Sequence, residues 1–197
     1  SAASTSLSPP ASSPALSSIT SGVSVTLDSG QLGWATNGRG GNAEGDLLSG
    51  IENVDATNFA DVLYGDGYGN ALRGRQDGDS LFGGEGSDML LGNQGADLLE
   101  GGAGSDTISG GEGGDSISSG AGDDSINVAQ GDTVTGGDGD DYFNLVDLGE
   151  AATGTITIIG GEGGETGGDT LALNGLHGGN TINIIDPDDV NGGLSGN

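Results

Sequence analysis

Acidic residues recur through the middle of the chain at a spacing that could hold metal ions. Between residues 56 and 144 an aspartate or asparagine returns every nine residues, with one single-residue deletion before Asp132. The members are Asp61, Asn70, Asp79, Asp88, Asp97, Asp106, Asp115, Asp124, Asp132 and Asp141. Hard carboxylate and carbonyl oxygens favour calcium over transition metals. The series therefore predicts a row of calcium sites.

Glycines precede most of these residues at fixed offsets. When the aspartate is position six of a nonapeptide, glycine recurs at positions one, two and four, and the glycines predicted to line the sites are Gly83, Gly84, Gly86, Gly101, Gly102, Gly104, Gly110, Gly111, Gly113, Gly120, Gly122, Gly136, Gly137 and Gly139. Because glycine accepts positive φ, such a turn can aim several carbonyl oxygens into one space. Calcium takes about six to eight oxygens. We expect one turn to supply half of them and the next turn on the same side the rest.

A large apolar residue follows each aspartate by two positions. These residues are Leu63, Leu72, Leu81, Leu90, Leu99, Ile108, Ile117, Ile126, Val134 and Phe143. We expect six residues of each unit to form a turn and three to form a strand whose middle side chain points inward. Two units then make one coil of 18 residues. Alternate apolar residues should stack into two facing columns, which form a thin core.

Four units carry a resemblance to a known family: GGEGSD (83–88), GGAGSD (101–106), GGEGGD (110–115) and GGDGDD (136–141). They resemble the repeats-in-toxin (RTX) nonapeptide, G-G-x-G-x-D-x-U-x, where U is a large apolar residue. The resemblance implies an all-β fold, a parallel β-roll or right-handed β-solenoid, with capping strands at both ends. It also implies type I secretion and folding on contact with external calcium.

Departures from the repeat pattern limit the number of ions. Five turns on each side allow at most four sites per side, and we expect roughly five to eight calcium ions in all. The best-formed sites are expected at Asp79, Asp88, Asp97, Asp106, Asp115 and Asp124. The poorest are expected at Asp61, Asn70 and Asp132, because Asn70 is neutral and the glycine pair before Asp132 is replaced by Val128 and Ala129.

The flanking segments suggest a division into four parts. Residues 1–18 read as a flexible Ser/Ala/Pro linker, 19–55 as N-terminal capping strands, 56–144 as the calcium-binding roll, and 145–197 as C-terminal capping strands with a degenerate repeat. In the first cap, Val23, Val25 and Leu27 should share one strand face, and Leu47, Leu48, Ile51 and Val54 should form a small cluster. In the second cap, strands are expected at 155–159 and 180–185, with an inserted repeat before Asp169 whose Leu171 and Leu173 point inward.

Composition narrows the partners. The 197 residues include 45 glycines, no cysteine and three arginines as the only cations, and the formal charge is −27. Such a charge opposes binding to nucleic acid or anionic membranes, and no stretch reaches the roughly 18 apolar residues of a membrane span. Each buried apolar side chain contributes about 1.5–3 kcal/mol, whereas each ordered backbone residue costs about 1–2 kcal/mol. We therefore expect disorder without calcium. A merely flexible acidic linker would not keep position eight apolar.

Three functions remain open. The first is a structural or adhesive protein, secreted to the medium or cell surface, assembling as a homo-oligomer or filament in a surface layer or matrix. Calcium sites with dissociation constants of about 10⁻⁴–10⁻³ M suit that location, and a secretory signal at the N-terminus is not recognisable. The second is a non-catalytic module of a larger secreted enzyme, since GxSxG, HExxH and paired catalytic carboxylates are missing and no enzyme activity is expected. The third is a precursor fragment, because residues 155–173 resemble segments that precede self-cleaving Hint domains in marine bacterial repeat proteins.

Overall fold

The computed structural model describes residues 22–27, 33–34, 47–48, 51–146, 155–161, 168–173 and 181–185. Within these residues the regular structure is entirely β-strand, without any helix. The strands are β1 (Ser24–Thr26), β2 (Gly33–Trp34), β3 (Leu47–Leu48), β4 (Asn53–Asp55), β5 (Val62–Tyr64), β6 (Ala71–Arg75), β7 (Ser80–Glu85), β8 (Met89–Gln94), β9 (Leu98–Ala103), β10 (Thr107–Glu112), β11 (Ser116–Ala121), β12 (Ser125–Val128), β13 (Thr133–Asp138), β14 (Tyr142–Leu145), β15 (Thr155–Ile159), β16 (Thr170–Leu173) and β17 (Thr181–Ile185).

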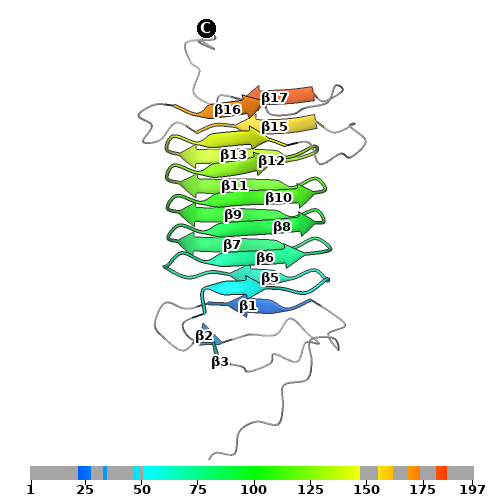
Figure 1. The fold of residues 1–197 in the computed structure, drawn as a ribbon, viewed down its shortest axis with the longest axis vertical. Helices are drawn as coiled ribbons and strands as arrows, with labels where there is room; N and C mark the ends of the chain where they lie inside the picture. Colours follow the sequence, from blue (N-terminus) through cyan, green and yellow to red (C-terminus); the bar gives the residue numbers. More distant parts are fainter. Residues whose placement is uncertain are drawn as a thin grey trace, which may run out of the picture.

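Two parallel sheets face each other along the length of the molecule (Figure 1). Through the repeats, successive strands alternate between an eight-stranded sheet, ordered β1-β5-β7-β9-β11-β13-β15-β17, and a seven-stranded sheet, ordered β16-β14-β12-β10-β8-β6-β4. Leu81 pairs with Leu63 on one side and Leu99 on the other, which is a step of 18 residues. The parallel β-roll with 18 residues per coil is confirmed. β2 and β3 form a separate antiparallel pair.

The strands are longer than the three residues expected. β7 to β11 each span six residues, because the chain keeps pairing through positions one to three of the next nonapeptide. Gly84 pairs with Gly102 and Glu85 with Ala103, while position one is left out of the register. The prediction of a six-residue turn was therefore wrong in detail. Neighbouring coils also satisfy each other's amides and carbonyls across part of the predicted turn.

The core consists of the two predicted columns. The position-eight side chains are all at most 2% exposed, and each pairs with its counterpart in the next coil. The columns continue beyond the repeats, since Val25 joins Leu63 and Ile158 joins Val134 in the larger sheet. Aliphatic side chains at every second position of stacked strands meet only one another, so the interior is narrow and apolar.

Apart from the β2–β3 pair, the flanking strands of both ends are further strands of the same two sheets. At the N-terminal end Val25 and Leu27 are buried and Val23 packs against the core, as predicted. Ile51 was expected in an apolar cluster but is 41% exposed, because it precedes β4 rather than lying in the sheet. The predicted linker 1–18 lies outside the described residues.

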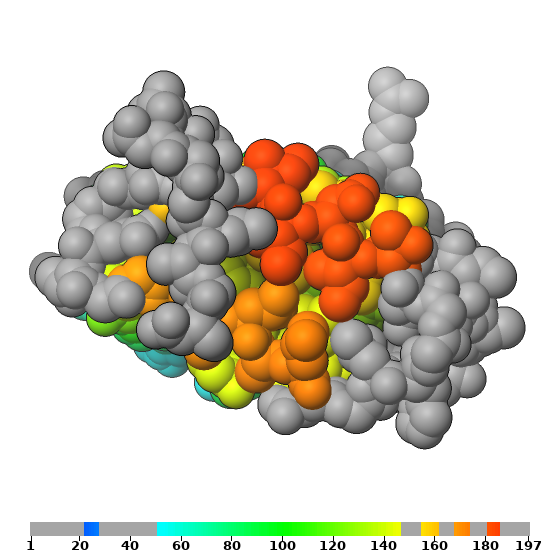
Figure 2. All heavy atoms as spheres, turned by 90° about the horizontal axis from the view of Figure 1, so that it is seen from above, coloured from blue at the N-terminus to red at the C-terminus, as the bar shows by residue number. Residues whose placement is uncertain are grey.

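At the C-terminal end the predicted strands are present as β15 and β17, and β16 follows Asp169. Figure 2 looks onto this end, where residues 170–173 in orange and 181–185 in red lie over the yellow strands. Leu171 packs against the core as predicted. Leu173 is 61% exposed, contrary to expectation. It pairs with Leu145 at the edge of its sheet, and β16 is the last strand of that sheet among the described residues.

Candidate metal sites

The predicted acidic residues form two columns joined by hydrogen bonds. In each coil the backbone amide of the position-six residue donates to Oδ1 of its counterpart in the next coil, over distances of 2.7–3.0 Å. One column contains Asp61, Asp79, Asp97, Asp115 and Asp132, and the other contains Asn70, Asp88, Asp106, Asp124 and Asp141. The one-residue deletion before Asp132 does not break either column. The stacking predicted from the sequence is therefore observed.

The second carboxylate oxygen of most of these aspartates is buried and unpaired. Oδ2 makes no hydrogen bond in Asp79, Asp88, Asp97, Asp106, Asp124 and Asp141, although these residues are at most 3% exposed. A buried carboxylate oxygen without a partner is costly, and such atoms are rare in native proteins. A row of them at equivalent places indicates that a cation belongs beside them.

Position-one glycines leave open the space next to these oxygens. A Cβ on Gly83 would collide with Oδ2 of Asp88 and with the carbonyl oxygen of Gly101 in the next coil. A Cβ on Gly92 would likewise collide with Oδ2 of Asp97 and with the carbonyl oxygen of Gly110. A carboxylate and a backbone carbonyl from adjacent coils thus converge where glycine has no side chain. Oxygen donors of this type fit calcium.

Glycines at positions two and four have positive φ. Gly102 and Gly104 have φ of 112° and 131°, and a Cβ on either would collide with the preceding coil's backbone, at Gly84 or Gly86. Arg75, Asp77 and Asn93 take the same kind of conformation without being glycine, with φ of 97°, 62° and 78°. Asp and Asn tolerate this region better than other residues. The glycine geometry predicted for the turns is present.

The three turns expected to bind most weakly satisfy their own side chains. The amide of Thr57 donates to Oδ2 of Asp61 at 2.7 Å, and the amide of Ala129 donates to Oδ2 of Asp132 at 2.7 Å. The amide of Asp66 donates to Oδ1 of Asn70 at 2.7 Å. In these three turns the position-two amide donates to the side-chain oxygen that has no hydrogen-bond donor in most of the other turns. Sequence reasoning missed these internal donors, although the lost glycines at positions one and two marked two of the turns.

Burial raises the pKa of the column carboxylates. The pKa rises to about 7 in Asp79 and Asp141 and to about 6 in Asp106 and Asp132, first because burial removes water and then because like charges lie nearby. The pKa values of Asp88, Asp97 and Asp124 are also raised by burial. Each of these groups resists ionisation unless a positive charge accompanies it.

Side chains alone do not complete a metal site in the described residues. No group of three or more Asp, Glu, His or Cys side chains comes close enough to hold an ion there. Backbone carbonyls must therefore provide most of the ligands. This agrees with the predicted half-sites, in which each turn adds one carboxylate to several carbonyls. The donor set, the open space and the unpaired oxygens all fit calcium.

Ser119 stands where other units have the position-one glycine. Its side chain is fully buried, and its hydroxyl donates to the carbonyl of Gly136 at 2.7 Å. Ser119 was not predicted as a site residue, although it is the only serine among the position-one glycines of its column. At this turn the hydroxyl lies beside the carboxylate of Asp124 and lowers its pKa against the larger effect of burial, whereas the other turns of the same column have a glycine there.

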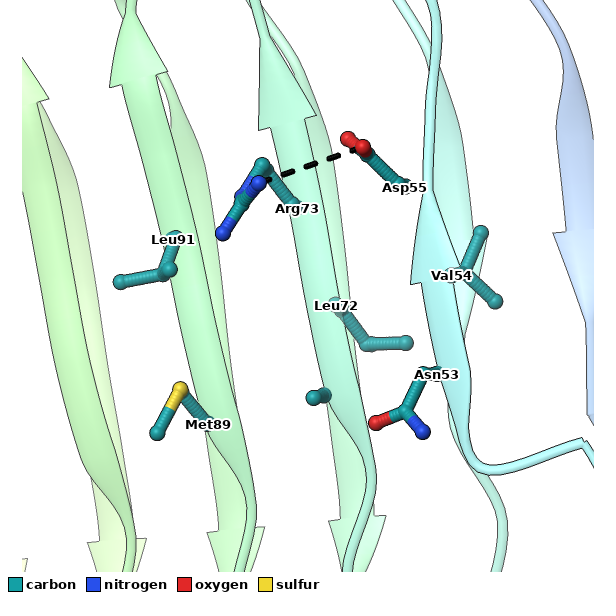
Figure 3. A pocket seen from close by; sticks show the side chains of 8 residues that line it. Asn53, Val54, Asp55, Leu72, Arg73, Met89 and Leu91 are labelled. Atoms are coloured by element: carbon teal, nitrogen blue, oxygen red, sulfur yellow. Dashed lines mark ion pairs between the residues drawn. The ribbon is translucent and has the colours of Figure 1, made fainter.

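A groove of about 260 Å³ lies outside the columns, along β4, β6 and β8. Figure 3 shows Arg73 next to Asp55 on the neighbouring strand, with Met89 and Leu91 further along the sheet. Asp55 is already engaged by Arg75, which donates to both of its oxygens at 2.6 Å and lowers its pKa. The groove is a shallow, mostly apolar strip with one neutralised carboxylate.

Comparison with known families agrees with this geometry. A family profile described as the RTX calcium-binding nonapeptide repeat matches four times, over residues 55–90, 64–99, 91–126 and 129–145. The repeat region belongs to this RTX family. No curated protein and no solved structure matched the chain.

The RTX matches coincide with the two columns. They include every predicted position-six residue from Asp61 to Asp141, and the array is a calcium-binding repeat array folded as a β-roll. They end at residue 145, so the strands β15, β16 and β17 lie outside the matched repeats. Asp169, which was not among the predicted ligands, continues the second column, since the amide of Asp141 donates to its Oδ1 at 3.0 Å.

Proposed function

We propose that this chain is a secreted calcium-binding repeat protein with a structural or adhesive role, whose roll folds as calcium fills its turns. The observation that carries the proposal is the row of buried Oδ2 atoms without hydrogen-bond partners in the RTX turns. Leaving these carboxylates ionised and uncompensated would oppose folding. When bound, calcium would neutralise them and cross-link adjacent coils. The aspartates and the carbonyls of the turns are the groups that would hold it.

The charge of the chain supports coupling between folding and calcium. The formal charge is −27, and both arginines in the described residues, Arg73 and Arg75, lie beside Asp55 rather than near the columns. The column carboxylates therefore have no arginine or lysine close by in the described part of the chain. Repulsion among them disfavours the compact state until cations enter.

The two classes of turn set the number of ions. We call a turn a consensus turn when its aspartate is not Asp61 or Asp132 and its position-six residue is not Asn70. A calcium site lies between two turns that are adjacent in one column; roughly five such pairs consist of two consensus turns, and about three pair a consensus turn with the turn of Asp61, Asn70 or Asp132. We propose roughly five to eight calcium ions, with the weaker ones at these last three turns. The aspartates of the turns proposed to bind calcium more strongly are Asp79, Asp88, Asp97, Asp106, Asp115, Asp124 and Asp141.

An extracellular, non-enzymatic role is the reading that the chain's features support best. Weak oxygen sites fill at millimolar calcium and stay empty at cytosolic levels. The strong negative charge disfavours nucleic acid as a partner, and no helix in the described residues could cross a membrane. We propose that the chain itself has no catalytic site and that export uses type I secretion.

The open ends of the sheets support assembly of rolls into a homo-oligomer or filament. β1 and β4 lie at one end and β16 and β17 at the other, and each is the edge strand of its sheet among the described strands, so a second roll could pair with it. The alternative is a non-catalytic RTX module of a larger secreted enzyme or of a Hint-processed precursor. The precursor reading is supported by the resemblance of residues 155–173 to segments that precede Hint domains; within them β15 (Thr155–Ile159) and β16 (Thr170–Leu173) continue the two sheets.

Electron microscopy and light scattering in calcium, in EGTA and in magnesium test the structural role. We expect ordered polymers in millimolar calcium only, and magnesium serves as the control for a general charge effect. Monomers at every calcium concentration would refute the structural role and favour the module. A calcium titration adds a test of location, because a midpoint near 10⁻⁴–10⁻³ M is expected. A submicromolar midpoint would contradict the extracellular assignment.

A further inference from the structure

Residues beyond the RTX matches rebuild a turn of the same design. Gly160 and Gly161 follow β15, which pairs with β13, so they lie over Gly136 and Gly137. A Cβ on Gly161 would collide with the carbonyl oxygen of Gly137, just as a Cβ on Gly137 would collide with that of Gly120. Gly160 and Gly161 therefore occupy positions one and two of a further turn.

The end of this turn also matches the repeats. The amide of Gly168 donates to Oδ1 of Asp140 at 3.0 Å, as the amide of Asp140 donates to Oδ1 of Asp123 one coil earlier at 3.0 Å. The amide of Thr170 donates to the carbonyl of Asp141 at 2.7 Å, whereas the φ of 81° at Gly168 differs from the position-five residues of the consensus turns. The chain thus returns to the register of the second column, with ten residues (160–169) where the unit below has six (136–141).

Asp169 takes position six. Its Oδ1 accepts the amide of Asp141, and its Oδ2 lies against Gly160, where a Cβ would collide with it. Oδ2 of Asp88 lies against Gly83 in the same way. The glycine pair and the position-six aspartate of a consensus turn are thus present at the two ends of this insertion, although Asp169 is exposed and Gly161 has no positive φ.

Below it, Asp141 has an oxygen that needs a partner. Asp141 is 1% exposed, and its Oδ2 makes no hydrogen bond. It is the last aspartate inside the RTX matches. Asp169 places a second carboxylate one coil above it, and the described residues place no arginine, lysine or histidine side chain in an ion pair with either.

We propose that Asp141 and Asp169 complete a further calcium site, beyond the RTX array, which fastens the last coil to the roll. β16 begins at Thr170, directly after Asp169, and pairs with β14, which begins at Tyr142, directly after Asp141. An ion between these two aspartates holds the starting points of both strands together. The inference rests on the proposed calcium-dependent role of the array.

Asp169→Asn tests the site in the full chain. Asparagine keeps Oδ1 as an acceptor for the Asp141 amide, so the substitution removes the charge and spares the hydrogen bond. Asp138→Asn is the matched control, because it removes the same charge from an exposed position at the same end of the roll. Bound calcium is counted by elemental analysis after dialysis, and amide hydrogen exchange is measured in β16 and in β8 to β11.

We expect Asp169→Asn to bind about one calcium ion fewer than the wild type and to exchange about tenfold faster in β16. Exchange in β8 to β11 should not change, and Asp138→Asn should match the wild type in both measurements. Full loading and normal β16 exchange in Asp169→Asn would overturn the site, and so would an equal loss in Asp138→Asn.

A measurement on the wild type guards against a variant that folds poorly. Protection of β16 should appear as calcium is added, and protection of β16 that persists in EGTA while β8 to β11 lose theirs would also overturn the site. The outcome for the proposed function is separate, because a wild-type protein that binds calcium and folds on binding it supports that function whether or not the Asp169 site exists.

Discussion

The backbone amide of Asp79 donates a hydrogen bond of 2.7 Å to Oδ1 of Asp97, its counterpart one coil further along. The relationship recurs along both columns, and it divides the carboxylate between two roles. In Asp97, Oδ1 fixes the register of neighbouring coils, whereas Oδ2 is buried without a hydrogen-bond partner. Substitutions that keep one oxygen and change the charge can therefore separate folding geometry from ion binding.

Asp97→Asn should raise the calcium concentration needed for folding. Asparagine still offers Oδ1 to the Asp79 amide but cannot supply the anionic Oδ2. We expect the calcium midpoint to rise several-fold, by roughly one lost charged ligand worth about 1–3 kcal/mol. A calcium titration followed by circular dichroism measures it, and an unchanged midpoint would contradict the assigned role.

Asp61→Asn is the contrasting case. Both oxygens of Asp61 accept hydrogen bonds from Thr57, so the amide group of asparagine would oppose a donor. We expect a loss of about 1–2 kcal/mol in the free energy of unfolding, and the loss of no ion except the weak one proposed at this turn. Loss of more than one ion would contradict the division between weak and consensus turns. The measurements are denaturant unfolding in saturating calcium and metal analysis.

Gly113→Ala should be far more damaging than Gly114→Ala. Gly113 has a φ of 130°, and its Cβ would collide with the carbonyl oxygen of Gly95. A Cβ on Gly114 would come no closer than 3.3 Å to the Gly131 carbonyl oxygen, and its φ is not positive. We expect Gly113→Ala to cost more than about 2 kcal/mol and Gly114→Ala less than about 1 kcal/mol. Equal stabilities in denaturant would show that the stacked turns are not as tight as observed.

Leu99→Ala and Leu98→Ala compare adjacent residues on opposite faces of β9. Leu99 is fully buried in its column and Leu98 is 37% exposed. We expect Leu99→Ala to lower the free energy of unfolding in calcium by about 2–5 kcal/mol. Leu98→Ala should change it by less than about 1 kcal/mol. Similar losses in urea titrations would contradict the position of the core.

Acidification should have opposite effects with and without calcium. Burial raises the folded-state pKa of Asp79 and Asp141 to about 7, above the unfolded value of 3.8, so the folded chain binds protons more tightly. Without calcium, stability is therefore gained as the pH falls from about 7 toward 4 and is lost as it rises through 7. With calcium, protons compete with the ion, and the calcium midpoint should increase between pH 7.5 and 5.5. Circular dichroism in EGTA and in calcium checks both slopes, and slopes of the same sign would contradict the raised pKa values.

The periodic features could be predicted from the sequence. The apolar position of Leu99 and the aspartate position of Asp97 both recur every nine residues. When such repeats stack, one register buries all the apolar residues and aligns all the aspartates. The division of turns into strong and weak followed from lost glycines. The hydrogen bond from the amide of Ala129 to Oδ2 of Asp132 could not be predicted. It depends on the backbone conformation of a turn that lacks the glycine pair.

Features at the ends and in the turns were less predictable. Leu173 alternates with the inward-facing Leu171, so the sequence pattern predicts that it is buried. Its observed exposure depends on whether another strand covers it, and a repeat pattern carries no information on that. The strands ran into the turns because backbone pairing at Gly84 and Gly102 does not depend on side chains. Asp169 was recognisable as part of a degenerate repeat. Its alignment with Asp141 became evident only from the hydrogen bond between them, because the turn that ends at Asp169 has ten residues instead of six.

Circular dichroism of the full chain during a calcium titration decides whether calcium drives folding of the roll. Starting in EGTA at pH 7.5, we expect a spectrum without ordered β structure that changes cooperatively to a β spectrum as calcium rises, and magnesium at equal concentration should not reproduce the change. A β spectrum that is already complete in EGTA and indifferent to calcium would contradict calcium-driven folding.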